Sequence, residues 1–470
     1  MNRRELLRLT GEIMAAPLVA GPAASLQTRR PKRVVIIGGG ISGLCTGYEL
    51  LKRGHDVTVL EASGRPGGHV RTIRDPLAAG LYADGGAEHF TRPGYERFWG
   101  YVQEFNLPVS HCAQRDHTSR YIDGRWYAEE MLRDARILER LGFNQRERKY
   151  LADHPWSELG LLYYRPYLDR FTDEYRPFEA GLDELDNISI TELLERDGAS
   201  AVGIRHLGGS SSALHVLWHA AILALRGVAL FPQEVFRITG GNQRMTDSFA
   251  ERLGDNLLLG CPVSAIEHGN TGVTITYNGF GRTKQLEADY AVACINLSML
   301  RKISVTPEWP EGKSYAIRHV PYYSNTRVIF QSRSRFWERD ELSPNRVFGQ
   351  PGLSTVWQMA AEVDTGRGLL EGAAPGVVSA QQALKTFRAL YPGKSQDIEQ
   401  AYVVNWALDP WAALCETTLY APGQLRKIWP HVIEPVGRIY FAGAYADNLN
   451  WGMEAATRSA NRVADAINEA

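Results

Sequence analysis

RVVIIGGGISGLCTGYELLKRGHDVTVLEASGRPGGHVR, residues 33–71, is the part of this chain that most strongly predicts its fold. The β-branched run 34–37 predicts a buried strand, and an amphipathic helix follows through Leu51. Between them, Gly38, Gly40 and Gly43 have the G-x-G-x-x-G spacing of a dinucleotide-binding turn. The first glycine permits the tight turn, the second lets a pyrophosphate approach the backbone, and the third lets helix pack on strand. The helix N-terminus offers N–H groups and a partial positive charge to the phosphates.

A second predicted strand, 56–60, ends in Glu61, whose carboxylate can accept hydrogen bonds from both ribose hydroxyls. An acid here, with no nearby arginine aimed at a 2′-phosphate, disfavours NADP. A lone G-x-G-x-x-G is a weak signal because glycine-rich turns are common. Here strand, glycines, helix, second strand and acid occur in order, which predicts a Rossmann-type α/β domain.

The residues after the acid separate FAD from NAD. EASGRPGG, 61–68, resembles the E-x-x-x-R-x-G-G signature of the flavin amine oxidase superfamily, which includes monoamine, polyamine and L-amino-acid oxidases. GRIYFAG at 437–443 and WGMEAA at 451–456 resemble the strand and helix with which this family returns to its nucleotide domain. In the family, that helix N-terminus faces the flavin, where its dipole stabilises negative charge on reduced flavin. The resemblance runs from about residue 32 to the C-terminus and is diffuse across roughly 110–230.

The resemblance implies FAD as the cofactor and places its contacts along the whole chain. The backbone at Val263 is expected at the adenine, and a backbone N–H near Met453 at the flavin pyrimidine. The expected cofactor-binding residues are Gly38, Gly40, Ser42, Gly43, Glu61, Ala62, Arg65, Gly68, His69, Gly86, Ala87, Val263, Gly443 and Met453.

Cys415 is a further candidate for contact with the cofactor. Residues 409–423 align with the monoamine oxidase stretch whose cysteine bonds the flavin 8α-methyl group. Such a bond requires a thiolate near that methyl group. Most relatives have a small residue here and bind FAD non-covalently, which favours coincidence. Release of all flavin on acid precipitation would exclude the covalent link.

The chemistry implied by the resemblance is two-electron oxidation of a carbon next to nitrogen. The flavin accepts a hydride, the imine product hydrolyses, and O2 usually reoxidises the flavin with release of peroxide. The cofactor supplies the electronics, while the protein supplies positioning and desolvation. The expected partners are therefore a small-molecule amine and O2 or another electron acceptor.

Three positions depart from the family pattern. Arg327 stands where the family usually has a lysine that holds a water beside flavin N5; arginine keeps the charge but does not readily deprotonate, so a dehydrogenase remains open. The two aromatic cage positions hold Glu416 and Gly452, although Trp451 can supply a shifted ring and Glu416 can attract an ammonium group. His89 lies where L-amino-acid oxidases commonly place a carboxylate-binding arginine, for which Arg92 is close enough to substitute.

Glu88 and His89 are therefore candidate catalytic residues, together with Arg327 and Trp451. The acid and the imidazole can recognise a cation or shuttle a proton, or they can form a buried hydrogen-bonded pair beside the flavin. Three functions stay open at this point: amine oxidation, a desaturase or isomerase reaction on the same fold, and a non-catalytic FAD-binding protein.

The predicted organisation is a two-domain α/β (α+β) protein in which the FAD domain is discontinuous. Its pieces are 32–90, 233–310 and 425–470, and the substrate-binding domain comprises 91–232 and 311–424. The first substrate segment is expected to be largely helical, at 95–105, 129–140, 190–196 and 211–225. The second is expected to form strands from 326–330 onward, with a helix near 380–391.

Composition fits a large soluble enzyme. The chain has 470 residues, 44% hydrophobic and 22% charged, and a net charge of −1, which gives no sign of nucleic-acid binding. No apolar run approaches the roughly 18 residues needed to span a bilayer. The five cysteines lack metal-ligand spacing, so no metal is expected, and a homodimer stays open.

The N-terminus resembles an export signal. NRRELLR, 2–8, matches the twin-arginine pattern, and the moderately apolar segment 13–26 follows it. Residues 1–28 are therefore predicted to direct a folded flavoprotein to the periplasm. The alternative is a frayed N-terminal helix on a cytoplasmic protein, which Glu12, directly before the apolar segment, favours.

Overall fold

The computed structural model describes residues 30–112, 117–232, 234–339, 342–391, 393–414, 417–449 and 452–470. Contacts divide the chain into two units, Met1–Pro31 and Lys32–Ala470, and the elements below belong to the second. The predicted export signal lies outside the described residues, as do Cys415, Glu416 and Trp451.

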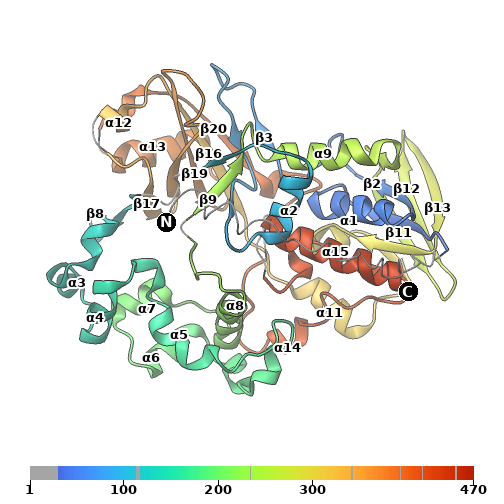
Figure 1. Ribbon diagram of the computed structural model, residues 1–470, viewed down its shortest axis with the longest axis horizontal. Coiled ribbons are helices and arrows are strands. Elements are labelled where there is room, and N and C mark those ends of the chain that lie inside the picture. Colours follow the sequence, from blue (N-terminus) through green and yellow to red (C-terminus); the bar gives the residue numbers. More distant parts are fainter. Residues whose placement is uncertain are drawn as a thin grey trace, which may run out of the picture. The chain divides into compact units, whose positions relative to one another are not determined.

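A five-stranded parallel sheet forms the nucleotide-binding region (Figure 1). The opening motif folds as β1 (Arg33–Ile37), α1 (Ile41–Lys52) and β2 (Asp56–Leu60), as the sequence predicts. The strand order is β10-β2-β1-β14-β21, with β10 at Leu257–Leu258, β14 at Tyr290–Ala293 and β21 at Ile439–Phe441. Each of the three segments predicted for the FAD domain thus supplies at least one strand, while their boundaries stay predictions.

Both faces of this sheet are buried, which explains why its strands are apolar throughout. Val34 and Ile36 pack with α1, with α9 (Gln243–Leu253) and with α15 (Gly452–Glu469). Val35 and Ile37 belong to the cluster on the opposite face. Figure 1 shows α1 and α15 side by side, although one opens this region and the other closes the chain.

A second layer beside this sheet is a four-stranded sheet in the order β13-β12-β11-β15. Its strands are β11 (Val263–His268), β12 (Val273–Gly279), β13 (Arg282–Ala288) and β15 (Ser304–Thr306). Short strands link the sheets to the rest of the chain: β3 (Thr72–Ile73) with β4 (Ala83–Asp84), and β5 (Phe90–Thr91) with β9 (Val235–Ile238) and β6 (Val109–His111).

The two predicted substrate-domain segments meet in one seven-stranded sheet, ordered β20-β16-β19-β18-β17-β7-β8. The second segment supplies β16 (Asn325–Ser332), β17 (Arg346–Gln350), β18 (Leu353–Met359), β19 (Gly368–Pro375) and β20 (Ile398–Asn405). The first segment supplies β7 (Ser119–Ile122) and β8 (Arg125–Ala128), which the sequence reading did not anticipate.

Apart from β6, β7, β8 and the end of β5, the regular elements of the first segment are helices, as predicted. It contains α2 (Glu96–Glu104), α3 (Ala135–Leu141), α4 (Gln145–Asp153), α5 (Leu161–Leu168), α6 (Ile190–Arg196), α7 (Ala201–Leu207) and α8 (Ala213–Leu225). The prediction of one continuous helix at 129–140 was wrong, because this segment forms two separate elements. A 3-10 turn covers Glu129–Arg133, and Asp134 then caps α3 by accepting hydrogen bonds from the Arg136 and Ile137 N–H groups.

The remaining α-helices of the unit are α10 (Leu297–Leu300), α11 (Glu311–His319), α12 (Phe336–Arg339), α13 (Ala380–Leu390) and α14 (Leu425–Ile428). Among the described helices, none combines the length and apolar character required to cross a bilayer.

Candidate functional site

A cavity of about 560 Å³ lies where the carboxyl ends of β1 and β2 meet the start of α1. Ligands of open α/β sheets bind at this end of the strands. The cavity brings together residues from distant parts of the chain, and most of those predicted from the sequence line it. The predicted cofactor-binding residues in its wall are Gly38, Gly40, Ser42, Glu61, Arg65, Gly68, His69, Gly86, Ala87, Gly443 and Met453. Three of the four predicted catalytic residues, Glu88, His89 and Arg327, also line it.

The glycines of the turn play two different physical roles. A Cβ atom on Gly43 would lie 1.9 Å from the Gly38 carbonyl oxygen, so this residue serves helix–strand packing and does not line the cavity. Gly38 has φ +104, a backbone conformation that favours glycine. By contrast, a Cβ atom on Gly40 would meet nothing within 4 Å and would enter the cavity. The space beside Gly40 therefore has the form of a cradle for a close-lying group.

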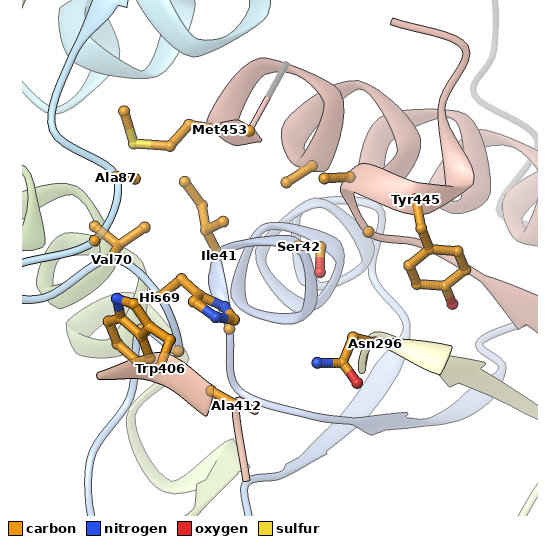
Figure 2. Close-up of a pocket in the computed structure, with 18 of the residues that line it drawn as sticks. Ile41, Ser42, His69, Val70, Ala87, Asn296, Trp406, Ala412, Tyr445 and Met453 are labelled. Atoms are coloured by element: carbon orange, nitrogen blue, oxygen red, sulfur yellow. The ribbon is translucent and has the colours of Figure 1, made fainter. Parts of the chain in front are cut away.

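The N-terminus of α1 faces this cradle without a side-chain cap. Gly40 is its N-cap residue, no side chain hydrogen-bonds to the cap, and no acid lies in the first turn. Buried Ser42 lies in this turn and lines the cavity (Figure 2). A helix N-terminus arranged in this way is suited to an anion such as a pyrophosphate.

Glu61 is held in place at the other side of the cradle. Its Oε2 accepts a hydrogen bond from the Gly39 N–H at 2.6 Å, and its Oε1 accepts one from the Ser63 N–H at 2.8 Å. Each carboxylate oxygen has a second lone pair, so the fixed carboxylate can also accept hydrogen bonds from ribose hydroxyls. Two predicted contacts are placed elsewhere, because neither Ala62 nor Val263, the first residue of β11, lines the cavity.

The start of α15 forms another part of the wall. Met453, in its first turn, is buried and lines the cavity (Figure 2). Glu454 follows but does not offer a free carboxylate there, because it accepts hydrogen bonds from the Arg97 and Phe98 N–H groups. Burial raises the pKa of Glu454 to about 8, so its carboxyl is largely neutral at pH 7. The positive end of the α15 dipole is therefore not cancelled by its own first turn.

Trp406 and His69 form one side of the cavity, with ring centroids 4.4 Å apart (Figure 2). The indole N–H of Trp406 donates to the Gly85 carbonyl at 2.8 Å. His69 contacts the Leu414 carbonyl oxygen through Nε2 at 2.6 Å, and burial lowers its pKa. A Cβ on Gly86 would lie 1.8 Å from the His69 carbonyl oxygen, so only glycine fits there. The sequence reading missed Trp406, which follows the end of β20.

Arg327, Glu88 and His89 form one connected group. Arg327, on β16, donates from Nη2 to Glu88 Oε2 and, at 3.1 Å, to the Gly86 carbonyl oxygen. His89 Nδ1 lies 3.1 Å from Glu88 Oε1. Burial acts to raise the pKa of Glu88, but the charge of Arg327, helped by the neighbouring His89, outweighs it and lowers the pKa to about 2. Glu88 is therefore an anion at working pH, and Arg327 is its cation.

Arg92 was predicted as a substitute for the arginine missing at His89. The structure places Arg92 on the surface with its guanidinium 5.3 Å above the Trp99 ring, and it does not line the cavity. Of the predicted aromatic cage, Gly452 lines the cavity, and Glu416 and Trp451 lie outside the described residues. Aromatic residues that the sequence reading did not assign are present instead: Tyr95, Phe231, Tyr322, Tyr323, Trp411 and Tyr445.

These features fit FAD. The open cradle at Gly40, the uncapped α1 and the fixed Glu61 suit a pyrophosphate and a ribose. At the part of the cavity where the resemblance places the flavin, the start of α15 offers the positive end of its dipole, and Arg327 places a guanidinium that is paired with Glu88.

Comparisons with known proteins agree with this site. A family model described as "Flavin containing amine oxidoreductase" matches residues 41–468. The chain is 26% identical to an L-amino acid oxidase of Cerastes cerastes, over 94% of this chain and 88% of that protein. It is 27% identical to an L-amino-acid oxidase of Bothrops moojeni, over 94% of this chain and 90% of that protein.

Two solved structures have a similar fold. Cyclohexylamine oxidase from Brevibacterium oxydans superposes with a TM-score of 0.76 at 21% identity, covering 93% of this chain and 99% of that one. Putrescine oxidase bound to putrescine superposes with a TM-score of 0.77 at 20% identity, covering 94% and 99%.

Proposed function

This chain belongs to the flavin-containing amine oxidoreductase family and uses FAD to oxidise a C–N bond, and from this premise we propose that its substrate is an amine without a carboxylate on the reacting carbon. Bound FAD supplies the acceptor for two electrons and a hydride. The isomerase and non-catalytic alternatives are left without support.

The pairing of Arg327 with Glu88 carries this proposal. Among the described residues, two permanent cations line the cavity, Arg65 and Arg327. Arg65 donates to the Pro66 and Gly68 carbonyl oxygens, beside the Glu61 end, and Arg327 is neutralised by Glu88. A substrate carboxylate would therefore lose its water shell without gaining an uncommitted arginine, which is unfavourable.

The other residues suit a neutral amine with an apolar substituent. Aromatic side chains in the wall can take the apolar part and exclude water. His89, oriented by the Glu88 carboxylate, is the group that accepts a proton from an incoming ammonium, since only the free amine can release hydride readily. O2 is the proposed reoxidant, with Arg327 as the cation at the flavin.

The matched pair phenethylamine and L-phenylalanine tests the substrate class, because the two differ only in the carboxylate. We expect phenethylamine to bleach the oxidised flavin band anaerobically at least about tenfold faster than L-phenylalanine, the factor that 1.4 kcal/mol gives. Readmitted air should restore the band if O2 is the acceptor. Faster bleaching by the amino acid would support the second candidate, an L-amino acid, which the L-amino-acid oxidase relatives favour.

His89→Arg sharpens this test. If the missing arginine explains the preference for phenethylamine, the variant should change the ratio of the two bleaching rates in favour of L-phenylalanine by about tenfold or more. The reason is that a hydrogen bond to a charged group contributes about 1.5–3 kcal/mol. The FAD content of both proteins, measured from absorption, must match. An unchanged ratio of bleaching rates would show that the residue at position 89 does not determine whether a substrate carboxylate is accepted.

We also propose that the protein is exported in folded form with FAD bound, which the twin-arginine pattern at residues 2–8 supports. Arg3→Lys combined with Arg4→Lys should move the protein from the periplasmic to the cytoplasmic fraction of a bacterial host, as followed by immunoblotting. Because lysine and arginine carry the same charge, a change in the net charge of the N-terminal segment cannot explain a change in localisation. Equal distribution of both proteins would count against export by this route.

A further inference from the structure

Glu371 is a buried acid that the proposed reaction does not use. It lies on β19, is fully buried, and does not line the cavity. On the sheet, its neighbours include the apolar side chains of Ile329, Trp357 and Ala373. Among the described residues, neither of its carboxyl oxygens has a hydrogen-bond partner. A carboxyl group in such a place is costly unless it has a specific task.

The strand register brings Glu371 to Arg327. On the antiparallel pair β16 and β19, Arg327 lies opposite Ala373, and Ile329 lies opposite Glu371. Alternate residues share a face, so Arg327 and Glu371 are diagonal neighbours on the same side of the sheet. Glu371 Oε1 lies 3.9 Å from Arg327 Nε. The guanidinium thus has Glu88 at one edge and Glu371 near another.

Charge balance defines the state of Glu371. The single positive charge of Arg327 is already matched by ionised Glu88. Burial raises the pKa of Glu371 well above its usual range; Arg327 and Arg237 oppose this rise, and the charges of Glu88 and Asp84 add to it. Burial and the two neighbouring acids favour the neutral carboxylic acid of Glu371, the form that can lie beside the guanidinium without adding a negative charge.

We propose that Glu371 is a positioning residue for Arg327: its carboxyl group lies against the guanidinium from the sheet side, 3.9 Å from Nε, and keeps the guanidinium at the cavity wall. An arginine suits this arrangement because its planar fork presents several donor edges, whereas a lysine is a point charge. The inference rests on the proposed function only for FAD binding in this cavity and does not depend on which amine is oxidised.

The reduction potential of bound FAD tests the proposal without any substrate. A cation beside the flavin favours its reduced, more negative form. Glu371→Leu removes both oxygens at similar size, so Arg327 should move and the potential should fall. We expect at least a tenfold change in the two-electron equilibrium constant, which is 29.6 mV. Glu371→Gln keeps an acceptor oxygen. Its two-electron equilibrium constant should therefore stay within about threefold of that of the unsubstituted protein, which corresponds to about half of the 29.6 mV shift.

A double-mutant cycle shows whether the effect passes through Arg327. In an Arg327→Met background, Glu371→Leu should cause no further change in potential. An equal fall with and without Arg327 would overturn the proposal, as would an unchanged potential in the single variant. A rise in potential would also overturn it, because it would show that Glu371 acts as an ionised neighbour of the flavin.

Thermal unfolding separates positioning from a structural role. Removing an unsatisfied buried carboxyl from an apolar cluster should leave the Tm of Glu371→Leu unchanged or higher. The matched control is Glu147→Leu, another fully buried glutamate, which accepts from the Asn144 and Ser200 N–H groups and from the Tyr163 hydroxyl. That variant should lose Tm without a shift in potential. If Glu371→Leu does not fold, Glu371→Met replaces it, and failure of both to fold would contradict the proposal.

Discussion

Replacing Gly40 by valine is expected to lower the affinity for FAD by a factor on the order of 100, while the FAD-free protein unfolds as the unsubstituted one does. Gly40 has φ −70 and ψ 175, which valine adopts without strain, and an added Cβ meets no protein atom within 4 Å. The new side chain instead enters the cavity where the pyrophosphate is expected. Overpacking of about 1–3 kcal/mol converts to roughly a 5- to 140-fold loss of affinity, and a branched side chain in this space is expected near the upper end. Quenching of FAD fluorescence measures the affinity, and calorimetry of the FAD-free protein measures its stability.

Two other glycines serve as controls for this variant. Gly43→Ala should do the opposite and lower the stability of the FAD-free protein by about 3 kcal/mol or more, because its Cβ would lie 1.9 Å from the Gly38 carbonyl oxygen. Gly64→Val should change neither quantity, since Gly64 is exposed, has open space around it and does not line the cavity. If Gly40→Val bound FAD as tightly as Gly64→Val, the cradle would not hold the pyrophosphate.

The contrast between these glycines shows which features of the fold a sequence pattern can predict. The motif at 33–61 specifies both the packing contact and the cradle, because strand, turn and helix are consecutive and interact locally. The same holds for α6, where the predicted range 190–196 is the observed one. In such segments the hydrophobic period and the capping residues agree, so little depends on the rest of the fold.

One missed element had a local signal that was overlooked. The hairpin β7–β8 turns at Asp123 and Gly124, which both have positive φ. Asp-Gly between two short runs is among the strongest hairpin signals, because this turn type requires positive φ at both positions. The helical spacing of apolar residues elsewhere in the segment predicts helices and does not reveal this short hairpin.

The site itself depends on contacts that no local pattern carries. Glu88 and Arg327 were each predicted as catalytic, but their pairing depends on how β16 packs against the loop after β4. Glu371 had no signal at all, since GLLEGAAP predicts only a strand with one acid, and its burial follows from the order of a seven-stranded sheet. Most residues that the sequence predicts for the cofactor therefore line one cavity, whereas the ion pairs of Arg327 are apparent only from the structure.

Glu88→Gln is expected to lower the free energy of unfolding at pH 7 by about 3–5 kcal/mol, the cost of breaking a buried ion pair by removing one partner. The variant leaves Arg327, which is 15% exposed, without the carboxylate that neutralises it. The exposed pair of Arg176 and Glu179 provides the control, and Glu179→Gln should cost no more than about 1 kcal/mol. Urea unfolding at one fixed FAD concentration measures both.

The pH dependence of this difference provides a stricter test, because its sign is fixed. The pKa of Glu88 falls from its ordinary value of 4.5 to about 2 in the folded protein, so the folded state binds the proton more weakly than the unfolded state does. Its contribution, about 3 kcal/mol for a shift of this size, is fully present above pH 4.5 and is lost as the pH falls toward 2. Unfolding curves of the unsubstituted protein and of Glu88→Gln should therefore differ most at pH 7 and converge near pH 2. A difference that persisted undiminished at pH 2.5 would mean that shape rather than charge accounts for the loss, and Arg327 would then not depend on Glu88 as its counter-ion.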